Sequence, residues 1–167
     1  EVLEAGKTLA RIYGERDLLI SECIREGVWS KLDPAGLAAM AAALVYEARR
    51  EEEWEPRIPK GNFQEIMQTT TEIWEDLEDL AHSHKLGQTP PLDLSLSLPI
   101  HRWASGAKLD SVLDSADLLA GDFIRWTKQI IDVLDQIAQT AGPELAETAK
   151  AAVDKVKRGI VAYSYYG

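Results

Sequence analysis

The sequence of 167 residues is poor in the residue types that build metal sites and phosphate-binding loops. It has one cysteine, three histidines and 11 glycines. Nearly all of the cysteine and histidine side chains would have to converge to make a closed zinc site. The glycines form neither a G-x-x-x-x-G-K-S/T loop nor a G-x-G-x-x-G loop, and no G-x-S-x-G or H-E-x-x-H motif occurs. We therefore predict no catalytic residue, no metal site and no cofactor within these residues.

Long apolar runs and an excess of positive charge are also missing. No apolar run approaches the roughly 20 residues that cross a membrane, and residues 1–8 lack the features of a secretory signal. Acidic residues outnumber basic residues by 28 to 18, which gives a formal net charge of -10. This charge argues against a protein that binds nucleic acid or an acidic membrane through a basic patch alone. The single cysteine, Cys23, cannot form an internal disulfide bond, so we expect a cytoplasmic protein.

Hydrophobic residues make up 46% of the chain, which is enough for the core of one domain. They recur at helical spacing, and no strand-like alternation persists. We predict a single all-α domain over residues 1–167, a bundle of about six to seven helices with a short extended lead-in at residues 1–13. The expected helices cover residues 15–27, 34–46, 63–85, 99–104, 109–113, 122–141 and 143–160. Asp33 and Pro34 predict an N-cap followed by a first helical position.

The expected helix over residues 122–141 is the most amphipathic segment of the chain. At 100° per residue, its apolar stripe contains Phe123, Thr127, Ile130, Ile131, Leu134, Ile137 and Ala138. Its opposite face contains Asp122, Arg125, Lys128, Gln129, Asp132 and Gln136. Arg125 and Gln129 project together, and a guanidinium and an amide can bind phosphates or base edges. From the pattern alone, a solvated face in which Lys128 pairs with Asp132 is the simpler interpretation.

Other polar or reactive residues fit ordinary structural roles. No histidine lies near Cys23 in the sequence to activate it, so we expect a buried thiol. Trp103 is expected in the core, whereas Trp126, beside the apolar stripe, fits either the core or a stacking role. Asp17 and Glu22 are assigned to capping and surface pairing.

Five blocks of sequence, taken in order, resemble the DSHCT domain, the C-terminal helical domain of superfamily-two RNA helicases of the exosome-helper kind. The similarity is closest to the bacterial HelY-type members and covers essentially the whole chain. The blocks are GKTLARIYGERDLLISECIREGVW, LDPAGLAAMAAALVYEARR, IHRWASGAKLDSVL, GDFIRWTKQIIDVLDQIA and AAVDKVKRGIVA. The ordered set is far more specific than any one block.

The resemblance implies that this chain is one domain of a larger helicase. In that family a pair of RecA-like domains of the same polypeptide binds and hydrolyses ATP with magnesium. The helical C-terminal domain packs on them and helps to close the channel through which single-stranded RNA is threaded. The resemblance implies that this chain is a C-terminal fragment with no catalytic residues. Its partners are then the RecA-like domains and single-stranded RNA. The fragment alone is expected to bind the RNA weakly. A first segment EVLEAGK without an initiator methionine fits a fragment boundary.

The resemblance also assigns residues to RNA contact. One long helix of the family faces the threaded strand and is described as a ratchet, and the GDFIR block is its family-like opening. Arg125 is then the leading RNA contact, with Gln129 and Lys128 on the same face. The VYEARR block corresponds to a place where the family has an acidic residue near the strand, which is Glu47 here.

A different class of function remains open from the residues themselves. A free-standing acidic helical adaptor could bind another protein through an apolar groove. The cations at Arg125 and Lys128 favour the helicase interpretation, whereas the net charge favours the adaptor.

Overall fold

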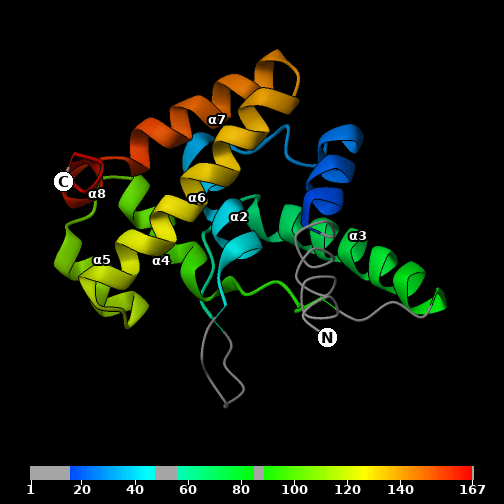
Figure 1. Cartoon of the computed structure of the whole chain (residues 1–167), viewed down its shortest axis with the longest axis horizontal. Helices are drawn as coiled ribbons and strands as arrows, with labels where there is room; N and C mark the ends of the chain where they lie inside the picture. The colour runs from blue at the N-terminus through cyan, green and yellow to red at the C-terminus, as the bar shows by residue number, and fades with distance from the viewer. Residues whose placement is uncertain (1–15, 48–55, 85–88, 167) are drawn as a thin grey trace, which may run out of the picture.

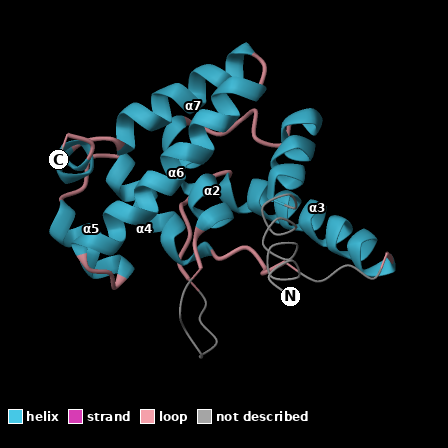
Figure 2. Ribbon diagram, viewed as in Figure 1, coloured by secondary structure: helices cyan, strands magenta, loops and turns pink. Residues whose placement is uncertain are grey.

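The computed structural model describes residues 16–47, 56–84 and 89–166, and these residues fold into an all-α bundle without strands, as predicted (Figures 1 and 2). A helix over residues 16–26 is followed by seven labelled helices and a short 3-10 turn. Their bounds are α2 Pro34–Val45, α3 Phe63–Ser83, η1 Leu94–Leu96, α4 Ser97–Ala104, α5 Leu109–Ala116, α6 Ala120–Thr140, α7 Pro143–Val156 and α8 Gly159–Ser164. The expected lead-in at residues 1–13 lies outside the described residues.

The alanine-rich helix α2 lies at the centre of the bundle and packs against α4, α6 and α7. Ten of its twelve residues, Ala35 to Leu44, are buried, so the helix is buried on all sides. Alanine side chains make this possible because they let neighbouring backbones approach from several sides. The buried hydroxyl of Ser97 at the start of α4 donates a hydrogen bond of 2.9 Å to the Ala39 carbonyl in α2.

The predicted cap of α2 is confirmed. Asp33 is the N-cap residue, and its Oδ1 accepts a 2.7 Å hydrogen bond from the Gly36 amide, with Pro34 at the first helical position. A Cβ atom on Gly36 would lie 2.9 Å from Asp33 Oδ1 and 3.1 Å from Leu32 Cδ2. Glycine at position 36 therefore leaves the space that the capping carboxylate occupies.

Helices α6 and α7 lie side by side, with α6 along the face of α2 (Figure 1). The predicted apolar stripe of α6 is confirmed, because Phe123, Thr127, Ile130, Ile131, Leu134 and Ile137 are buried, and Ala138 is half-buried against the core. Phe123 meets the Trp103 ring of α4 edge to face at a centroid distance of 5.5 Å. Trp103 is thus a core residue, as expected, and α6 is fixed in orientation by its buried face.

The final helix is shorter than the sequence pattern indicates, and the prediction of one helix over 143–160 is wrong. Helix α7 ends at Val156, and α8 begins at Gly159 after an extended Arg158 with φ -137° and ψ 167°. The Arg158 guanidinium stacks 3.6 Å from the centroid of Trp103 and donates hydrogen bonds to the Trp103 and Ala107 carbonyls. The Trp103 indole donates in turn to the Val156 carbonyl at 2.8 Å. These contacts hold Val156 and Arg158 against α4, and they explain why α7 ends at Val156.

Helix α4 starts two residues before the expected Pro99. The 3-10 turn η1, capped by Asp93, leads directly into Ser97. Proline is tolerated in the first turn of a helix because the amides there have no intrahelical acceptor.

The turn after the helix over residues 16–26 is held to α3 by a buried hydrogen bond of 3.0 Å from the Trp29 indole to the Thr70 hydroxyl. Cys23 lies on the inner side of this helix and is fully buried, as predicted. Burial raises the pKa of the Cys23 thiol to about 12, against a smaller lowering by a hydrogen bond with Thr70. The thiol is therefore protonated at neutral pH and serves as a small apolar group.

Replacing Asp33 with alanine is expected to lower the free energy of unfolding by about 1 kcal/mol, because the Gly36 amide loses its acceptor. Asp33→Asn keeps a side-chain oxygen at this position and should lose much less. Urea denaturation of the 1–167 chain measures both. Equal losses for the two variants would show that the cap does not stabilise α2.

Cys23 should resist thiol reagents in the folded chain. With a pKa of about 12, only about one thiol in ten thousand is ionised at pH 8, and the side chain is also closed to solvent. We expect labelling by a disulfide reagent to be at least about a hundredfold slower in buffer than in denaturing urea. Similar rates in the two solutions would contradict the buried position of this thiol.

Candidate nucleic-acid interface

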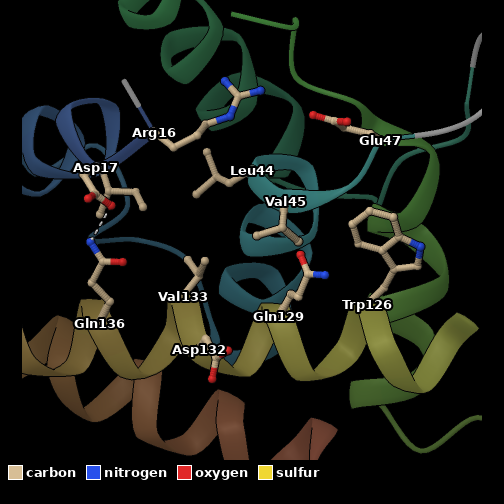
Figure 3. A pocket seen from close by; sticks show the side chains of 11 residues that line it. Arg16, Asp17, Leu44, Val45, Glu47, Trp126, Gln129, Asp132, Val133 and Gln136 are labelled. Carbon is tan, nitrogen blue, oxygen red and sulfur yellow. Dashed lines mark hydrogen bonds between the residues drawn. The ribbon is translucent and has the colours of Figure 1, made fainter. Parts of the chain in front are cut away.

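The polar side of α6 and the C-terminal end of α2 enclose a pocket of about 590 Å³ together with the helix over residues 16–26. Figure 3 shows Trp126, Gln129 and Gln136 rising from α6 toward the other two helices. We call this the larger pocket. Its lining residues are Arg16, Asp17 and Ile20 from the first helix, Leu44, Val45 and Glu47 from the end of α2, and Trp126, Gln129, Asp132, Val133 and Gln136 from α6.

A second pocket of about 350 Å³, the smaller pocket, adjoins the first near the start of α6. Its lining residues are Tyr46, Glu47, Asp117, Leu118, Asp122, Arg125 and Trp126. Glu47 and Trp126 line both pockets and so stand between them. Three of the four predicted RNA-contact residues, Arg125, Gln129 and Glu47, are thereby brought to one surface, although Glu47 is far from the other two in the sequence.

Arg125 is free to rearrange toward a ligand. Its side chain is 60% exposed, and Nη2 lies 3.3 Å from Asp122 Oδ1, one helical turn away. Such an exposed ion pair contributes only ~0–1 kcal/mol, so a ligand can displace it at little cost. The guanidinium carbon also lies 5.6 Å from the centroid of the Trp126 ring.

Trp126 forms a fixed aromatic wall between the two pockets. The side chain is half-buried, and its ring meets the Tyr46 ring edge to face at 5.0 Å and an interplanar angle of 76°. Tyr46 is buried at the C-cap of α2 and holds this contact in place. The sequence left open whether Trp126 is core or surface, and the structure places it at the boundary between them.

Lys128, the fourth predicted contact, lines neither pocket. Its Nζ donates a 3.3 Å hydrogen bond to the Ser164 carbonyl and lies 4.8 Å from the centroid of the Tyr165 ring. The interpretation that Lys128 pairs with Asp132 is therefore wrong, because the ammonium contacts the C-terminal end of α8 instead.

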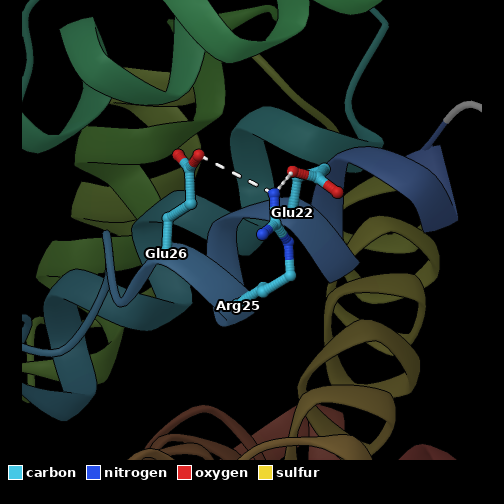
Figure 4. A network of polar contacts seen from close by, with 3 residues as sticks. All are labelled: Glu22, Arg25 and Glu26. Atoms are coloured by element: carbon cyan, nitrogen blue, oxygen red, sulfur yellow. Dashed lines mark hydrogen bonds and ion pairs between the residues drawn. The ribbon is translucent and has the colours of Figure 1, made fainter.

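Asp17 and Glu22 make the surface contacts expected of them. Asp17 Oδ1 accepts a 3.1 Å hydrogen bond from Gln136 Nε2, which closes one end of the larger pocket (Figure 3). Glu22 pairs with Arg25 at 2.6 Å, and Glu26 lies 3.9 Å from the same guanidinium (Figure 4). The hydrogen bond from Arg25 lowers the pKa of Glu22.

Arg16 is a lining residue that the sequence analysis missed. Its Nη2 donates to the Pro90 carbonyl at 2.8 Å, while Nη1 is buried without a hydrogen-bond partner in the described structure. Burial lowers the pKa of Arg16, and the charges of Glu47 and Glu78 partly offset this effect. No pattern in the sequence marks this residue, because its position depends on a contact with Pro90, which is 74 positions away in the sequence.

The charges around the two pockets favour some ligand groups over others. Among the described residues that line the smaller pocket, Glu47, Asp117 and Asp122 are acidic and Arg125 is the one cation. Three carboxylates repel phosphate, but they accept hydrogen bonds from the amino and imino groups of bases or from ribose hydroxyls. The surface is therefore suited to the base or sugar side of a nucleotide.

Two further properties concern the described ranges 16–47, 56–84 and 89–166. No group of three or more histidine, cysteine or acidic side chains in these ranges could hold a metal ion. None of their helices has the length and apolar character that a membrane crossing requires.

Comparisons with known proteins show the family to which this chain belongs. The model of the DSHCT (NUC185) domain matches residues 1–164. The chain is 36% identical over 173 residues to the "Probable helicase HelY" of Mycobacterium tuberculosis (strain H37Rv), covering 96% of this chain and 19% of that protein. For the "Probable helicase HelY" of Mycobacterium leprae the identity is 37%, covering 97% of this chain and 19% of the relative.

A more distant relative is the "DExH-box ATP-dependent RNA helicase DExH15 chloroplastic" of Arabidopsis thaliana, at 28% identity over 94% of this chain and 14% of the relative. The chain thus spans about a fifth or less of the length of these helicases. Because the family model and relatives above 30% identity both cover nearly all of its residues, this chain belongs to the DSHCT (NUC185) domain family.

Proposed function

We propose that this chain is the accessory helical domain of an ATP-dependent RNA helicase. It packs on RecA-like domains of the same polypeptide and lines a channel for single-stranded RNA, with α6 as a ratchet-like helix. ATP and magnesium are held by those RecA-like domains rather than by these 167 residues. Membership of the DSHCT family and relatives named as helicases support this proposal over a free-standing adaptor.

The observation that carries the proposal is the convergence of Arg125, Gln129 and Glu47 around the Trp126 ring. Arginine and tryptophan stack on bases of any sequence, and the amide and carboxylate bond to base edges or ribose hydroxyls. A motor that threads many sequences needs contacts of this kind, because they hold a strand without selecting a sequence.

The fold also supports a mechanical part for α6. Its inner face is buried along six positions from Phe123 to Ile137, and the helix packs on both α2 and α7. A displacement of the bundle by the motor would therefore carry Arg125, Trp126 and Gln129 as one rigid row. The row would then move whatever bases rest on it.

Replacing Arg125 with alanine in the full-length protein should lower RNA unwinding by about tenfold, the size of one lost stacking contact. ATP hydrolysis measured without RNA should stay unchanged, because the residue lies outside the motor. Both rates are measured on the same preparation.

Arg25→Ala is the matched control for this test. Arg25 is also an exposed arginine, with 68% of its side chain exposed, and it also pairs with an acid three residues earlier. Arg25→Ala should leave the rate of RNA unwinding unchanged. Normal unwinding by Arg125→Ala would remove Arg125 from the RNA contacts.

The isolated 1–167 chain should bind single-stranded RNA weakly. Its net charge is -10, and carboxylates surround Arg125, so little of the usual phosphate attraction is available. Fluorescence anisotropy with a labelled single strand at physiological salt measures this. A dissociation constant in the low micromolar range or below would show that the domain holds RNA without its partner domains.

A further inference from the structure

Three tyrosines are gathered at the exposed end of the chain, on and after α8. Tyr163 is 77% exposed, Tyr166 is 86% exposed and Tyr165 is 40% exposed. Exposed aromatic side chains in a cluster are typical of interaction surfaces, because tyrosine buries a large area there at a low entropy cost. Val161 in α8 is fully buried, so the segment that presents the tyrosines is anchored to the core.

Two lysines from different elements converge on one of these rings. Lys157, between α7 and α8, places Nζ 4.2 Å from the centroid of the Tyr165 ring. Lys128 of α6 places its Nζ 4.8 Å from the same centroid. The ring attracts each ammonium, but two like charges at one ring repel each other. Asp132 and Asp135 of α6, whose charges act on the same tyrosine, offset part of this repulsion, and a phosphate group at the ammoniums would offset more of it.

The charges of two carboxylates on α6 act on the Tyr165 hydroxyl, which can donate a hydrogen bond. Burial raises the pKa of Tyr165, and the charges of Asp132 and Asp135 on α6 raise it further. The phenol therefore stays protonated at neutral pH and can donate a hydrogen bond. We call Lys128, Lys157, Tyr163, Tyr165 and Tyr166 the α8 cluster.

The α8 cluster continues the candidate interface around α6. Lys128 follows Arg125 by three positions, so the two side chains are neighbours on the helix surface. The pockets beside Arg125 are rich in carboxylates and offer phosphate little attraction, whereas the α8 cluster offers two ammoniums and a phenol. The pockets could therefore contact the bases of a nucleic-acid strand, and the ammoniums of the α8 cluster could contact its phosphates.

We propose that the α8 cluster binds single-stranded RNA beside the α6 pockets, with Lys128 and Lys157 on phosphates and Tyr163 and Tyr166 stacked on bases. The proposal rests on the proposed function, since it concerns the same strand. It adds a contact surface outside the pockets.

The test measures binding of a fluorescein-labelled oligouridylate to the full-length protein across a series of salt concentrations. Lys157→Gln should reduce the slope of log affinity against log salt by about 0.7, the value for one phosphate contact on a single strand. Lys150→Gln, an exposed lysine of α7 paired with Glu147, is the matched control and should leave the slope unchanged.

Tyr166→Ala should weaken binding by roughly a factor of ten, the loss of one stacked base, whereas Tyr166→Phe should retain wild-type affinity. Lys157 and Tyr166 are both exposed, so the variants at these two positions should fold normally. The proposal would be overturned if Lys157→Gln kept the wild-type slope and Tyr166→Ala kept the wild-type affinity. The same result is expected if the cluster contacts a protein instead of RNA. If Arg125→Ala still impaired unwinding in that event, the proposed function would stand without the α8 cluster.

Discussion

The close packing of α2 determines where the rest of the described structure lies. Its alanines admit α4, α6 and α7 at short range, and its N-terminus depends on the Asp33 cap. The other end of α2 delivers Tyr46 and Glu47 to the side of α6. The aromatic contact between Tyr46 and Trp126, and with it the wall between the two pockets, follows from this arrangement.

The surface charge is distributed in a way that the net charge of the chain conceals. Around the turn of α6 that carries Arg125 the neighbours are carboxylates, whereas Lys128 and Lys157 meet at the Tyr165 ring, on which the charges of Asp132 and Asp135 also act. In the function that we propose, one region of this helix contacts bases and another contacts phosphates. The acidic domain would then supply a few positioned contacts, and most of the electrostatic attraction for the strand would come from other surfaces of the helicase.

Local patterns in the sequence were sufficient for the elements and much of the core. The stripe of α6, the cap at Asp33 and the buried Cys23 all follow from spacing or neighbouring residues. The end of α7 did not, because it is set by Arg158 stacking on Trp103. The neighbourhood of Glu47 and Arg125 likewise depends on packing between distant segments, and so does the position of Arg16.

The division of α6 into a buried stripe and a solvent-facing row has a consequence for how such domains diverge. Phe123, Ile130 and Leu134 support the fold, whereas Arg125 and Gln129 are exposed and carry little of its stability. Mutations in the outer row can therefore accumulate without unfolding the bundle. Ligand preference and thermal tolerance can evolve separately along the same 21 residues.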